Sequence, residues 1–69
     1  MPRNDATRLY MAAQVQGRTL ERQADGMRQA LCQLAAGRGS VQDVSNKADA
    51  IRLQLMYSEA LARELAAGN

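Results

Sequence analysis

The chain has 69 residues, of which 46% are hydrophobic and 23% charged, and its net charge is +2 at pH 7. A chain of this length forms at most one domain with a modest core, because small chains bury a small share of their surface. It has no histidine and one cysteine, Cys32, which excludes an intramolecular disulfide and a structural zinc site. We therefore expect self-association or docking on a larger protein to stabilise it.

Helix-forming residues dominate the chain, and the one proline, Pro2, stands where it interrupts no helix. No run of residues alternates between apolar and polar as a half-buried strand would. No apolar stretch approaches the roughly 18 residues of a membrane span, and the first residues lack the apolar segment of a signal peptide. The composition predicts an all-α cytoplasmic protein with a reduced thiol and no membrane contact.

A first helix is predicted over about residues 5–36, beginning near Asn4 or Asp5, either of which can cap it. Its apolar positions alternate four and three residues apart, which is the spacing of a coiled-coil seam. Gly17 lies on this seam, so that a close helix approach or a break of the helix at Gly17 are both open. The predicted seam consists of Ala6, Tyr10, Ala13, Gly17, Leu20, Ala24, Met27, Leu31 and Leu34.

Residues 37–40 are predicted to form a tight turn, with Gly37 ending the first helix in the left-handed conformation. A second helix follows over about residues 41–67, where Ser40 and Asp43 match a capping box. A connection this short makes the two helices antiparallel neighbours, so residues 1–69 form a single hairpin domain. The second seam consists of Val44, Ala48, Ile51, Leu55, Ser58, Ala62 and Leu65.

The second helix is apolar on more sides than one helix can cover, since Leu53, Met56 and Ala60 form another stripe beside its seam. This pattern predicts a homodimer, in which two hairpins form a four-helix bundle and the extra stripe faces the other subunit. The geometry of the two subunits stays open. The residues expected in the core or the dimer contact are Leu20, Met27, Leu31, Leu34, Ile51, Leu53, Leu55 and Met56.

Catalysis is not expected, because the chain has no histidine for proton transfer near neutral pH and no evident base beside Cys32. Glu21 and Asp25 lie four residues apart as metal ligands can, but arginines surround them and indicate a solvated charged face. The sequence thus predicts no catalytic residue, no cofactor and no metal site.

Protein binding is the expected function. Methionine adapts to varied partners, and tyrosine and arginine are common in binding hot spots. We expect the partner-binding surface at the end of the hairpin opposite the turn, formed by Tyr10, Met11, Val15, Arg18, Tyr57 and Leu61.

The two long helices, the Ala36–Gly39 connection and the aliphatic stretch from Ile51 to Leu65 resemble small two-helix co-chaperones of bacterial type III secretion, of the YscE/PscE kind. That resemblance implies a hairpin that packs on a helical-repeat chaperone and helps to hold a needle subunit unpolymerised. Three functions stay open. They are a small regulator or inhibitor, of the sort that phages and plasmids encode, that binds a larger bacterial protein; a co-chaperone of this kind; and a dimeric nucleic-acid-binding protein.

Overall fold

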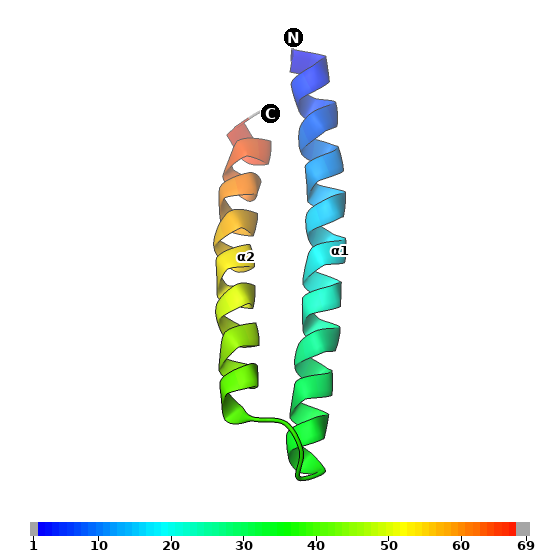
Figure 1. Ribbon diagram of the computed structural model, residues 1–69. Coiled ribbons are helices and arrows are strands. Elements are labelled where there is room, and N and C mark those ends of the chain that lie inside the picture. Colours follow the sequence, from blue (N-terminus) through cyan, green and yellow to red (C-terminus); the bar gives the residue numbers. More distant parts are fainter. Residues whose placement is uncertain (1, 68–69) are drawn as a thin grey trace.

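The chain forms a hairpin of two antiparallel α-helices in the computed structural model, which describes residues 2–67 and the side chains from residue 6 onward. Helix α1 spans Pro2–Ala35 and helix α2 spans Val41–Ala67. They lie side by side over the length of α2 (Figure 1). Every described residue outside the connection is helical, which confirms the predicted all-α class and the two-helix arrangement.

Helix α1 begins at Pro2, a few residues before the predicted start. Proline suits the first position of a helix, because its φ angle is already helical and the first amides have no helical acceptor. The prediction that Asn4 or Asp5 precedes the helix as its cap was therefore wrong, since both lie within it. Helix α1 is also continuous through Gly17, so the alternative of a broken helix was wrong. With 34 residues against 27, α1 extends past the end of α2 (Figure 1).

The turn is fixed by two glycines with positive φ angles, 81° at Gly37 and 77° at Gly39. The amide of Gly37 donates to the carbonyl of Leu34 at 3.0 Å, and the amide of Arg38 donates to the carbonyl of Gln33 at 2.7 Å. These two bonds form a Schellman motif, which satisfies carbonyls left free at the helix end. The predicted left-handed Gly37 is confirmed, and its position sets where the chain reverses.

Helix α2 starts with the predicted hydroxyl cap. The Ser40 Oγ accepts a hydrogen bond from the amide of Asp43 at 3.1 Å, as an N-cap residue does. The Asp43 carboxylate turns the other way and pairs with Lys47 Nζ at 2.9 Å. Only the Ser40 half of the predicted capping box is therefore present, and the acid joins an i,i+4 ion pair instead.

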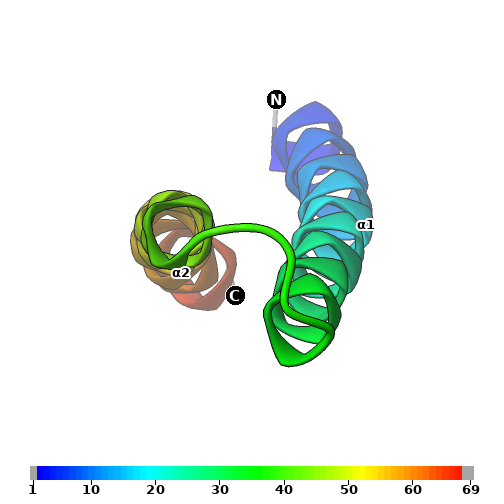
Figure 2. The ribbon, with the colours of Figure 1, turned by 60° about the horizontal axis from the view of Figure 1, so that its bottom comes forward.

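The hairpin is long and thin, with extents of 54 × 15 × 12 Å and a radius of gyration of 15.9 Å. A compact domain of this length would have a radius of gyration of about 11 Å. The tilted view in Figure 2 shows the reason for the large radius of gyration, which is that the two helices form a single layer. Among the described residues only two hydrophobic side chains are buried, Ala30 and Leu61, at 5% and 8% exposure.

The contact between the helices follows the predicted seam in part and is displaced towards one edge of it. On α1 the seam positions Ala13, Leu20, Met27 and Leu34 are half-buried as expected, but Tyr10, Gly17, Ala24 and Leu31 are exposed. The residues that replace these four are Leu9, Gln16, Gln23 and Ala30. On α2 the exposed seam residues Leu55 and Ala62 are replaced in the same way by Gln54 and Leu61.

The eight residues predicted for the core or the dimer contact therefore fall into two groups. Leu20, Met27, Leu34 and Ile51 are half-buried between the helices. The remaining four keep half or more of their surface exposed and are Leu31, Leu53, Leu55 and Met56. Leu53 and Met56 follow the contact residues Ile51 and Gln54 by two positions, which is about 200° around a helix. The extra stripe thus lies on the side of α2 that faces away from α1, and its predicted contact with a second subunit stays a prediction.

Candidate functional site

The most buried polar group of the hairpin lies in the helix contact. Gln16 is 7% exposed, and its Nε2 lies 2.8 Å from the Gln54 Oε1, 3.0 Å from the Gln54 carbonyl and 3.0 Å from the Ser58 Oγ. The Ser58 hydroxyl donates to the same carbonyl at 2.9 Å. Buried polar groups cost free energy unless they are hydrogen-bonded. These hydrogen bonds therefore favour one placement of α1 along α2, the one that brings Gln16 beside Gln54 and Ser58.

Gln16 and Gln54 were not predicted in the contact, because both seams were assigned mainly to apolar positions, with Ser58 as a polar exception. A signal was present in their spacing. Gln16, Gln23 and Gln54 stand at the heptad position three after Ala13, Leu20 and Ile51, respectively, and this position lies on the same helix face. A polar residue there is buried only if a partner helix supplies the acceptors, and the sequence alone does not show that.

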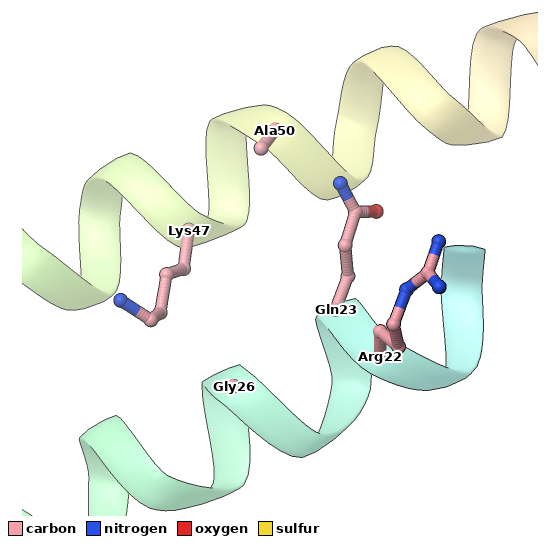
Figure 3. A pocket seen from close by; sticks show the side chains of 5 residues that line it. All are labelled: Arg22, Gln23, Gly26, Lys47 and Ala50. Carbon is pink, nitrogen blue, oxygen red and sulfur yellow. The ribbon is translucent and has the colours of Figure 1, made fainter. Parts of the chain in front are cut away.

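One side of the hairpin, here called the lysine side, has a hollow of about 200 Å³ lined by Arg22, Gln23, Gly26, Lys47 and Ala50. Figure 3 shows Gln23 extending from α1 towards α2, and Lys47 extending from α2 towards α1. A Cβ atom added at Gly26 would lie 3.6 Å from the Lys47 Cε, an ordinary contact. The buried Gln23 Oε1 accepts no hydrogen bond from the residues that the structure describes.

The opposite side, here called the groove side, is apolar. Its hollow of about 240 Å³ is lined by Ala13, Gln16, Gly17, Leu20, Ser58, Leu61, Ala62 and Leu65. Gly17 and Gly26 are nine residues apart, which is half a turn around the helix, so that the two hollows open on opposite sides. A Cβ atom at Gly17 would have nothing within 4 Å. The predicted close approach at Gly17 is therefore not made by α2.

The six residues predicted to bind a partner do not form one surface. Tyr10 lies on the groove side, seven residues from Gly17, and Tyr57 lies on the lysine side, seven residues from Ala50. Leu61 is buried against α1. Val15 is exposed seven residues from Arg22, on the lysine side. Met11 and Arg18 are exposed on the side of α1 that faces away from α2.

Two further apolar patches face outward. Met11 and Val15 are 55% and 53% exposed on α1, and Leu53 and Met56 are 66% and 64% exposed on α2. Met11, Leu53 and Met56 each lie about 200° around their helix from contact residues, whereas Val15 lies about 100° from the contact residue Gln16. Large hydrophobic side chains gathered on a surface mark interaction sites in soluble proteins.

The charged residues pair locally. Arg28 and Asp25 approach to 2.9 Å, and Arg52 pairs with Asp49, each within one helix. Pairs this exposed contribute little to stability. They also moderate the positive potential that nucleic-acid binding requires.

The described residues contain no group of three or more His, Cys, Asp or Glu side chains that could hold a metal ion. Cys32 is a free and exposed thiol. Neither helix, over the residues described, is long and apolar enough to cross a membrane.

Comparison with known protein families, with curated proteins and with solved structures found no match to this chain. Its function therefore has to be argued from its own residues.

Replacing Gln16 with Ala should lower the free energy of unfolding by about 1–3 kcal/mol, because polar groups of Gln54 and Ser58 lose their buried partner. Gln14 is the matched control, since its amide reaches only the exposed Tyr10 hydroxyl at 3.1 Å. Gln14→Ala should change stability by less than about 0.5 kcal/mol. Urea unfolding followed by circular dichroism at one protein concentration measures both variants. Equal losses would show that the Gln16 hydrogen bonds contribute nothing specific.

Proposed function

We propose that this chain is a non-enzymatic regulator that pairs with a second copy of itself and binds a larger bacterial protein. The observation that carries the proposal is the small core of the single hairpin. Ala30 and Leu61 are its buried hydrophobic residues, whereas nine large hydrophobic side chains are at least half exposed. They are Tyr10, Met11, Val15, Leu31, Val41, Leu53, Leu55, Met56 and Tyr57.

Self-association is supported by energetics. Burial of apolar surface is the main favourable term in folding, and helices this exposed gain little of it from each other. Chains below about 70–80 residues commonly obtain the missing stability from a disulfide, a metal ion or a second subunit. This chain has one cysteine and no histidine, so of these three sources of stability the second subunit is the one that it can use. The proposed assembly is a homodimeric four-helix bundle.

Binding of a larger protein is supported by the outward patches, Met11 and Val15 on α1 and Leu53 and Met56 on α2. None of the four lies on the groove side, so a dimer formed through that side leaves them accessible. Methionine side chains adapt to different partner shapes, which suits a regulator or inhibitor. The single exposed thiol fits the reducing cytoplasm as the place of action.

A co-chaperone of the type III secretion kind is the second candidate, and the same exposed apolar surface supports it. In that case another protein, rather than a second copy, covers the hairpin. The chain alone would then be a partly folded monomer or an aggregate, because much of its apolar surface would face water.

The mass of the purified chain separates these candidates. The regulator proposal predicts a stable helical dimer of twice the 7.5 kDa chain mass in sedimentation equilibrium at micromolar concentration, with thermal stability that rises with protein concentration. Circular dichroism on the same sample reports helicity. A helical monomer over the whole concentration range would contradict self-association, and a poorly folded monomer would favour the co-chaperone.

A further inference from the structure

The groove side carries an apolar strip on both helices. Gly17 of α1 and Ala62 of α2 line the same hollow, so they lie on one side of the hairpin. Residues seven positions apart share a helix face, which extends the strip in both directions from these two. The groove strip thus consists of Tyr10, Gly17, Ala24 and Leu31 on α1, and Val41, Ala48, Leu55 and Ala62 on α2.

The groove-side edge of the helix contact is lined mainly by apolar residues. The opposite edge of the helix contact, along the lysine-side hollow, carries the polar residues Arg22, Gln23 and Lys47. Four of the nine exposed large hydrophobic side chains stand together on the groove side of the two-helix layer, namely Tyr10, Leu31, Val41 and Leu55. A four-helix bundle has this geometry, because each of its helices turns its apolar face towards a central axis rather than towards one neighbour.

The exposed area agrees with a missing second layer. The hairpin exposes 5468 Å², whereas a folded monomer of 7.5 kDa exposes about 4,200 Å² by the usual scaling with mass. The excess of roughly 1,200 Å² exceeds the roughly 800 Å² that each partner buries in a standard interface. The excess is therefore large enough for a second copy on the groove side to bury an interface of standard size.

The order of side chains along the strip is compatible with a second copy that runs in the opposite direction. Ala24 and Ala48 stand at the same level, because the lysine-side hollow is lined by residues on either side of each of them: Gln23 and Gly26, Lys47 and Ala50. In α1, Gly17 and Leu31 are each seven residues from Ala24. In α2, Val41 and Leu55 are each seven residues from Ala48.

We propose that two copies pack groove side to groove side with their turns at opposite ends, about a twofold axis that passes beside Ala24 and Ala48. The inference rests on the self-association proposed above and names its surface. The axis pairs Leu31 of each copy with Gly17 of the other, and Val41 of each with Leu55 of the other, since a twofold contact is reciprocal. This packing explains the glycine at position 17, because the absence of a side chain at Gly17 leaves room for Leu31 of the second copy.

The face is tested by two substitutions of the same kind on one helix. Leu55, on the groove strip, is 50% exposed, and Leu53, on the outer side, is 66% exposed. Leu55→Glu should raise the dimer dissociation constant more than about 100-fold, because it places an unpaired charge in the contact. Leu53→Glu should change it by less than about threefold. Sedimentation equilibrium gives the constants, and circular dichroism verifies that both variants are helical.

The outcomes separate the two levels of the proposal. Dissociation by Leu53→Glu with Leu55→Glu still dimeric would overturn the groove face and leave self-association standing. A wild-type chain that is monomeric at every concentration would overturn the proposed self-association itself, and with it the face.

The register is tested by exchanging the sizes of one pair. Gly17→Leu should weaken the dimer about 5- to 100-fold, because two leucines then compete for one space. The single hairpin tolerates this change, since the position is open. Adding Leu31→Ala should restore much of the affinity, because the large and the small side chain of the pair then exchange places. A double variant that dimerises no better than Gly17→Leu alone would overturn the head-to-tail pairing, as a dimer with both turns at one end predicts.

Discussion

One helix can cover only one side of another, and this geometric limit shapes the whole hairpin. The apolar stripe of α1 is wider than the strip that α2 contacts, so one edge of the stripe is buried and the other stays exposed. Leu20 and Met27 lie half-buried between the helices, while Leu31, in the same stripe, is 51% exposed. The same division recurs on α2, where Ile51 is half-buried and Leu55 is exposed. The hairpin therefore leaves part of the apolar stripe uncovered on both helices.

The polar residues of the helix contact follow from this division. Gln16, Gln54 and Ser58 form hydrogen bonds with one another where a more apolar contact would be expected. Such bonds need matched positions on both helices, so they favour one alignment over neighbouring ones. The contact between α1 and α2 thus contributes alignment, and we propose that the groove strip supplies most of the apolar burial once a second copy covers it.

The ends of the elements could be predicted from the sequence, because local chemistry decides them. Gly37 has to adopt a positive φ angle, and Ser40 offers a hydroxyl to the first free amides; both signals are visible in a few neighbouring residues. The start of α1 was less accessible, since Pro2, Asn4 and Asp5 all suit a helix start. Heptad spacing gave the direction of the apolar stripe on each helix.

Which edge of that stripe meets the other helix could not be predicted. Gly17 and Gln16 are both reasonable contact positions by spacing, and the choice depends on the partner residues Gln54 and Ser58, far along the chain. A shift of this contact by one position also redistributes the surface residues. Tyr10 and Tyr57 were expected on one surface, yet they lie on opposite sides of the hairpin, because their positions relative to the contact differ. The expected partner surface therefore depended on a detail that spacing does not contain.

Contacts between copies can be observed directly by isotope-filtered nuclear Overhauser spectroscopy on a mixture of labelled and unlabelled chains. The account predicts cross-peaks between the Leu31 methyl groups of one copy and the Gly17 α-protons of the other. Intermolecular cross-peaks confined to Leu53 and Met56, or no intermolecular cross-peaks at all, would contradict the claim that the groove side is the missing half of the core.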